Sequence, residues 1–168
     1  MKPMADIGER AARLLSEYIQ INTTNPPGNE AQTAEFYAQQ LRQRGLEPHI
    51  YPSAPGRANV VARLHGNGDG SKGPLLLLHH MDVVTADAAD WSHDPFSGDI
   101  ADGFVYGRGA LDMKCFGIMH LIALDLLQEQ DRPLERDIIF LAVADEEQDG
   151  EFGARWMVDN HWETSPRK

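Results

Sequence analysis

Two apolar runs, each followed at once by ionisable residues, constrain the fold of this chain more than any other feature. The first is Pro74-Leu-Leu-Leu-Leu-His79, and the second is Asp137-Ile-Ile-Phe-Leu-Ala-Val-Ala144. Continuous apolar runs of this length are typical of strands covered on both faces. They predict an α/β protein whose mainly parallel or mixed sheet is sandwiched by helices.

The segments around these runs supply the other expected elements. Four segments predict helices: residues 6–19, 30–44, 110–130 and from 152 to 160. In the first two, apolar residues recur at helical spacing, whereas residues 110–130 are mostly apolar on every side, which is typical of a buried helix. Two short strands are expected at residues 47–51 and 58–64, and a hairpin at residues 100–106 turns at Asp102-Gly103. Helices therefore alternate with strands, as in an α/β sandwich.

The composition argues against some classes of binding partner and indicates a cellular compartment. The chain has 168 residues, which is a one-domain length, and 42% of them are hydrophobic, enough for a core. Its net charge of −11 argues against nucleic acid and against an anionic membrane surface, because both need clustered Lys and Arg. Cys115 is the only cysteine, and charged residues near the N-terminus stand where a signal peptide would be apolar. These features predict a cytoplasmic protein without disulfides.

Ionisable residues gather where ligands bind in α/β sheets. The first run leads into His80 and Asp82, the second leads into Glu146 and Glu147, and Asp112 lies at the start of the predicted long helix. Because ligands of open α/β sheets bind at the carboxyl ends of strands, these residues are expected to converge on one sheet edge.

The types of residue at this edge suit a metal ion. His80 and Asp82 are two apart and share a face in extended backbone, which suits a metal-bound imidazole held by a carboxylate. Glu146 and Glu147 are expected to point to different sides, one toward a metal and one toward water or substrate. Two adjacent carboxylates raise each other's pKa, and a divalent cation would relieve their repulsion.

Each signal taken alone also has an ordinary interpretation. The glutamate pair could be a solvated loop, Asp112 a helix N-cap, and Cys115 a small buried hydrophobe. The remaining histidines have no partner that the sequence identifies and are assigned to core or surface: His49, His65, His79, His93, His120 and His161. A calcium loop is set aside because alternating ligands are lacking, and a serine hydrolase because no Gly-x-Ser-x-Gly turn is present.

Four linked segments together resemble one enzyme family. They are LLLLHHMDVV, Trp91 with Asp94-Pro-Phe-Ser-Gly98, the run from Asp102 to Lys114, and Ala144-Asp-Glu-Glu147. Their order and spacing over residues 14–158 resemble the dinuclear-zinc family of aminoacylase, acetylornithine deacetylase, succinyl-diaminopimelate desuccinylase and glutamate carboxypeptidase.

The resemblance implies a role for each of these residues. His80 would bind one zinc ion, Asp112 would bridge two, and Glu147 would bind the second. Glu146 would be the general base, Asp82 would orient His80, and the peptide bond after Asp112 would be cis. Histidine and carboxylate ligands also accept Co²⁺ or Mn²⁺, so the two Zn²⁺ ions are the expected but not the sole candidates.

The implied reaction is hydrolysis of amide or peptide bonds in N-acyl amino acids or small peptides. Water activated by two zinc ions would attack the amide, with Glu146 moving the proton. The alternative is a truncated, non-catalytic remnant with weak or no metal binding.

The resemblance also predicts what this chain lacks. Family members complete their metal sites with an acidic residue beyond the glutamate pair and a histidine near the C-terminus, and they often form homodimers through a small second domain. The chain is therefore expected to be C-terminally truncated: residues 1–160 would form a partial catalytic domain and residues 161–168 a polar tail, with the dimerisation domain absent.

Overall fold

The computed structural model describes residues 4–69, 71–130 and 133–161. The helices are α1 (Met4–Ile19), α2 (Glu30–Gln43), α3 (Cys115–Gln128) and α4 (Ala154–Asn160). The strands are β1 (His49–Ala54), β2 (Arg57–Leu64), β3 (Leu75–His80), β4 (Ile100–Ala101), β5 (Phe104–Val105) and β6 (Ile138–Val143). The predicted helices and strands are thus confirmed, with shifts at their ends. No helix in these described ranges is long and apolar enough to cross a membrane.

The main sheet has the strand order β1-β2-β6-β3. The β1–β2 and β2–β6 pairs are antiparallel, whereas β3 and β6 are parallel, with Leu75 opposite Ile138 and His80 opposite Val143. The sheet is therefore mixed. Its one parallel pair in the described residues joins the two apolar runs, so their carboxyl ends lie side by side.

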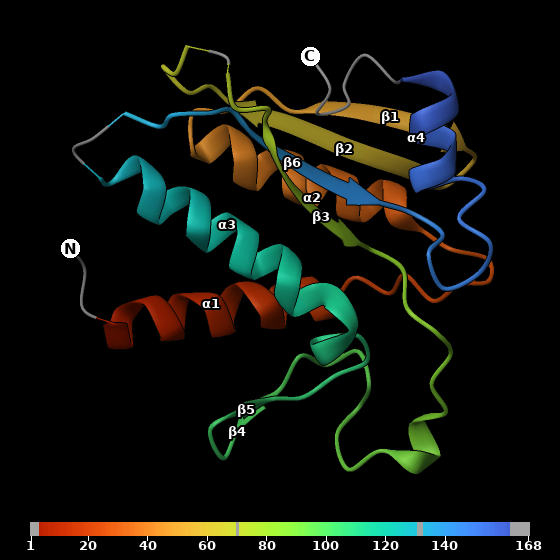
Figure 1. Cartoon of the computed structure of the whole chain (residues 1–168). Coiled ribbons are helices and arrows are strands. Elements are labelled where there is room, and N and C mark those ends of the chain that lie inside the picture. Colours follow the sequence, from red (N-terminus) through yellow and green to blue (C-terminus); the bar gives the residue numbers. More distant parts are fainter. Residues whose placement is uncertain (1–3, 70, 131–132, 162–168) are drawn as a thin grey trace.

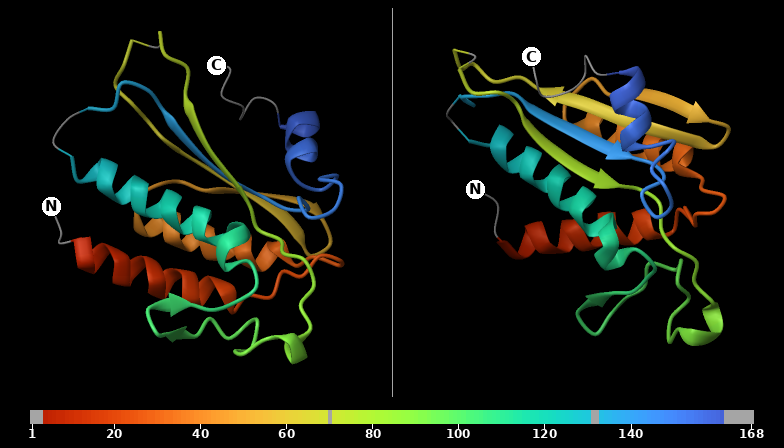
Figure 2. Two further views of the ribbon diagram at one scale, coloured as in Figure 1. Left: turned by 60° about the horizontal axis from the view of Figure 1, so that its bottom comes forward. Right: turned by 45° about the vertical axis from the view of Figure 1, so that its right-hand side comes forward.

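Helices cover both faces of this sheet (Figures 1 and 2). Helices α1, α2 and α3 lie on one face, where residues such as Tyr37, Leu121 and Phe140 form the main core. Helix α4 lies on the other face, where Met157 packs on Val61 and Ile139 in a smaller cluster. The predicted sandwich of helices around a sheet is confirmed.

The two apolar runs differ in burial, although both were expected to be fully covered. Strand β6 lies between β2 and β3, and Ile139, Phe140 and Ala142 are buried. In β3, however, Leu75 is 47% exposed and Leu78 43% exposed. The prediction is wrong for β3 because this strand lies at the edge of the sheet in the described residues, and α4 packs over β2 and β6 instead.

The long helix begins later than its apolar pattern predicts. Asp112 and the residue after it have non-helical backbone angles, and α3 starts only at Cys115, with Lys114 as its N-cap residue. Asp112 is therefore not the N-cap of this helix, and the peptide bond after it is cis, as the resemblance implied. Cys115 is half-buried rather than buried, and the side chains of Phe116 and Met119 are exposed.

Candidate metal centre

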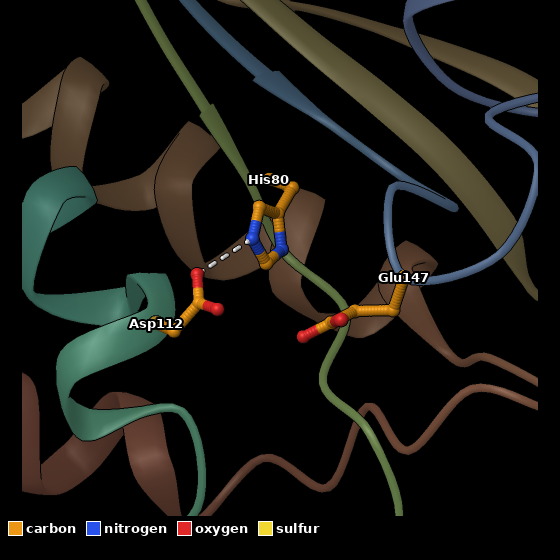
Figure 3. A group of neighbouring side chains, drawn as sticks. All are labelled: His80, Asp112 and Glu147. Carbon is orange, nitrogen blue, oxygen red and sulfur yellow. Dashed lines mark hydrogen bonds and ion pairs between the residues drawn. The ribbon is translucent and has the colours of Figure 1, made fainter.

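The parallel pairing of β3 with β6 assembles the site. His80 is the last residue of β3, and Glu146 and Glu147 lie in the loop that follows β6. Asp112 comes from the irregular turn before α3. Figure 3 shows His80, Asp112 and Glu147 pointing toward one another from these three segments. The predicted convergence at one sheet edge is confirmed.

The side chains are close enough to share an ion. One ligand atom from each of His80, Asp112 and Glu147 lies within 4.8 Å of the other two. The Nε2 atom of His80 lies 3.2 Å from Oδ1 of Asp112 and 3.5 Å from Oε2 of Glu146. His80 is buried, whereas the side chains of Asp112 and Glu146 are 80% and 60% exposed. The carboxylates therefore face solvent while the imidazole is fixed from behind.

Hydrogen bonding fixes the orientation of the His80 ring. Its Nδ1 atom lies 3.0 Å from the backbone oxygen of Asp82 and 3.6 Å from the Oδ1 atom of the same residue. A nitrogen that donates there leaves Nε2 directed at the acidic cluster, as in metal-ligating histidines. Burial lowers the pKa of His80, but Asp82, Glu146 and Asp112 outweigh it and raise this pKa to about 9. A divalent cation would take the place of that proton.

The glutamate that faces His80 and Asp112 shows the expected repulsion. Burial raises the pKa of Glu147, the charge on His80 opposes this, and the negative charges on Asp112, Asp82 and Glu146 raise it further. The predicted upward shift is thus present for Glu147. A cation among these oxygens would remove the repulsion, so one imidazole and these carboxylates fit the ligand set of Zn²⁺, Co²⁺ or Mn²⁺.

Asp82 makes more contacts than the sequence predicted. Its carboxylate accepts the backbone N–H groups of Glu146 and Glu147, each at 3.0 Å, and a side-chain N–H of Asn25 at 2.8 Å. Burial acts to raise the pKa of Asp82, but His80 and these hydrogen bonds lower it overall. Asp82 therefore stays ionised and holds the loop that carries both glutamates.

A buried ionic network behind this loop was missed at the sequence level. Arg57 contacts the fully buried Glu30 through Nε and Nη2, at 2.5 and 2.8 Å, and Asp145 through Nη2 at 2.9 Å. Asn25 lies within residues 22–29, for which the sequence predicts only a turn, and Glu30 follows directly after them. The sequence offered one signal for this network: Arg57 stands next to the apolar second strand, where a charged side chain needs an oppositely charged partner.

Two of the remaining histidines form a pair that the sequence did not identify. His79 is buried, as its core assignment predicts, and its Nδ1 atom lies 3.3 Å from Nδ1 of His120. Burial and the nearby His120 and His80 hold the pKa of His79 well below its usual value. His79 also packs against the rings of Tyr37 and Phe140, so it serves the core.

Lys114 joins the start of α3 to the end of α1. Its buried Nζ donates to the backbone oxygens of Tyr18 and Ile21, at 3.0 and 2.8 Å, and lies 4.5 Å from the centre of the Tyr18 ring. Burial lowers the pKa of Lys114 to about 7. The lysine follows Asp112 by two residues, so these bonds help to fix the turn that presents this carboxylate.

Replacing Lys114 with methionine is expected to lower the free energy of unfolding by about 1–3 kcal/mol, because the carbonyl oxygen of Ile21 loses this donor and that of Tyr18 keeps only the backbone N–H of Ile21. Urea unfolding followed by circular dichroism measures the change. Lys72→Met is the control, since Lys72 forms an exposed pair with Glu135 and such pairs contribute about 1 kcal/mol or less. Equal losses in the two variants would show that the buried bonds of Lys114 contribute little.

The sequence matches a known protein family and several of its members. The model of peptidase family M20/M25/M40 matches residues 76–167. Pig aminoacylase-1 is 36% identical over 146 residues, which are 86% of this chain and 36% of that protein. Succinyl-diaminopimelate desuccinylase of Methylorubrum populi is 40% identical over 126 residues, which are 70% of this chain and 31% of that protein. The chain thus spans about a third of the length of these relatives.

Solved structures share the fold. Human carnosine dipeptidase 1 superposes with a TM-score of 0.71 at 24% identity, over 90% of this chain and 35% of that one. A dinuclear metal binding peptidase of the M20 family from Bacillus subtilis superposes with a TM-score of 0.65 at 19% identity, over 94% and 40%. The family match covers more than half of the sequence and includes His80, Asp112, Glu146 and Glu147. The chain belongs to peptidase family M20/M25/M40.

Proposed function

We propose that this chain is the metal-binding part of a hydrolase that cleaves amide or peptide bonds in N-acyl amino acids or small peptides. The observation that carries the proposal is the meeting of His80, Asp112 and Glu147 at one sheet edge, with ligand atoms within 4.8 Å. The similarity to aminoacylase-1 and to succinyl-diaminopimelate desuccinylase supports the substrate class.

The proposed ligands divide between two ions. His80 would bind one Zn²⁺, Glu147 would bind the other, and the exposed Asp112 would bridge them. Asp82 would orient His80, through its backbone oxygen at 3.0 Å as well as its carboxylate. Co²⁺ or Mn²⁺ would suit the same donors.

Glu146 is the proposed general base. Its carboxylate is exposed and lies 3.5 Å from His80, so it reaches the cluster while remaining open to solvent. Bound metal would lower the pKa of a coordinated water and polarise the scissile carbonyl. Glu146 would take the proton from that water and pass it to the leaving nitrogen, which avoids expulsion of an amide anion.

The proposed domain organisation follows the expectation from the sequence. Residues 1–160 would form part of a catalytic domain, and further ligands, the groups that select the substrate and the dimer contacts would come from segments outside these residues. Most of the proposed polar tail, residues 162–168, lies outside the described residues.

Calorimetric titration with Zn²⁺, followed by assay of N-acyl amino acid hydrolysis, tests the proposal. Binding of two ions per chain with measurable hydrolysis is the expected result for a site that closes within the chain or between copies. Binding without hydrolysis would mean that the chain supplies only half of a catalytic site. Absence of both would support the alternative of a non-catalytic remnant.

A further inference from the structure

Asn25 occupies an unusual position behind the metal centre. It lies buried in the connection between α1 and α2, and its backbone N–H donates to the oxygen of Val83 at 2.8 Å. Its side-chain Nδ2 donates to two carboxylates, Oδ2 of Asp82 at 2.8 Å and Oδ1 of Asp145 at 2.9 Å. Both N–H groups of one amide are thus used to hold two buried acids.

The two acids that Asn25 joins bind opposite ends of one loop. Asp82 accepts the backbone N–H groups of Glu146 and Glu147. Asp145 accepts the backbone N–H of Phe152 at 3.2 Å and contacts Arg57. Among the described residues, the amide of Asn25 is the side chain that donates to both acids, and it offsets the repulsion between them.

We propose that Asn25 is a positioning residue of the metal centre. By bridging Asp82 and Asp145, it fixes the backbone of Glu146 and Glu147, and so sets the direction from which their carboxylates approach His80 and Asp112. The consequence for metal binding rests on the proposed function. The consequence for the loop backbone does not, because the hydrogen bonds that hold the loop are formed by the protein alone.

A second buried asparagine shows that this arrangement is particular to Asn25. The amide of Asn59 donates to the backbone oxygen of Phe152 and accepts the backbone N–H of Ala144, so it holds main chain to main chain. Asn25 instead contacts the side chain that holds both glutamate N–H groups. Loss of the Asn25 amide would therefore disturb the loop of Glu146 and Glu147 before other parts of the fold.

Amide hydrogen exchange of the metal-free protein tests the inference directly. In the wild type, the amides of Glu146 and Glu147 should exchange slowly although they lie in a loop, because Asp82 accepts both. In Asn25→Ala, exchange at these two amides should become at least about tenfold faster, while amides of β6 that pair with β2 keep their rates. Asn25→Ser serves if the alanine variant does not fold, and one retained donor should give an intermediate change.

Asp125→Asn is the matched control for general loss of stability. Asp125 pairs with Arg10 and Arg44 and lies ten residues along α3 from Cys115, about 15 Å by helical rise. This variant should lower the unfolding midpoint without selectively exposing the two glutamate amides. Equal acceleration in Asp125→Asn and Asn25→Ala, or unprotected glutamate amides in the wild type, would overturn the inference.

Zinc titration provides the second measurement. Affinity should fall at least about tenfold in Asn25→Ala and further in Asn25→Asp, which adds a third carboxylate and removes both donors, but should hold in Asp125→Asn. Unchanged affinity in both Asn25 variants would contradict a positioning role. If the wild type binds no zinc, the proposed function fails, and the exchange rates still decide whether Asn25 fixes the loop.

Discussion

Replacing Glu147 with alanine is expected to reduce Zn²⁺ affinity at the second proposed ion at least about 100-fold, because it removes one of the two ligands, Glu147 and Asp112, that this chain would give that ion, whereas a catalytic zinc site has about three. Glu147 lies near His80 and Asp112, and its pKa is raised partly by the neighbouring acids. A cation beside this carboxylate would therefore be attracted by several negative charges. Calorimetric titration of the purified variant measures the loss.

Glu146→Gln is the matched control for this prediction. The two glutamates are adjacent, but Glu146 is proposed to move a proton and not to bind metal. Its variant should keep Zn²⁺ affinity within about threefold of the wild type while losing at least about 100-fold of any hydrolytic rate, which is within the range of general acid–base catalysis. If Glu146→Gln lost the metal and Glu147→Ala retained it, the two roles would be exchanged.

Replacing Arg57 with methionine is expected to destabilise the fold by about 3–5 kcal/mol at pH 7, because Glu30 would remain buried without its cation. Glu30 is fully buried and contacts Arg57 through both carboxylate oxygens, and Asp145 would lose the same partner. Urea unfolding measures the free energy. Arg63→Met is the comparison, since the Arg63–Asp137 pair is partly exposed and should cost about 1 kcal/mol.

The deficit of Arg57→Met should shrink on acidification. Burial raises the pKa of Glu30 above its ordinary 4.5 even though Arg57 opposes this, and removal of Arg57 would raise it further. Between the ordinary pKa of 4.5 and the raised pKa of Glu30 in the fold, the folded variant binds more protons than the unfolded chain, so its stability increases as the pH falls through that range. Adding Glu30→Gln should recover part of the loss at pH 7. A double variant no more stable than Arg57→Met would show that the unpaired charge is not the cause.

Local patterns were sufficient for most of the elements and for the members of the site. Helical periodicity gave α1 and α2, and the two apolar runs gave β3 and β6, because side-chain burial repeats with the geometry of each element. The same runs lead into His80 and Glu146-Glu147, so their convergence was expected because ligands of an α/β sheet bind at the carboxyl ends of its strands. The structure pairs β3 with β6 in parallel, and this pairing places the two carboxyl ends side by side.

Contacts between distant residues had no such local signal. The exposure of β3 depends on which strand ends the sheet, and the late start of α3 depends on a turn whose residues look helical in sequence. The network behind the site joins Glu30 to Arg57, 27 residues apart, and Asn25 to Asp145, 120 residues apart. A buried charge reads like a surface charge in sequence, because only the packed structure determines whether water or another side chain becomes its partner.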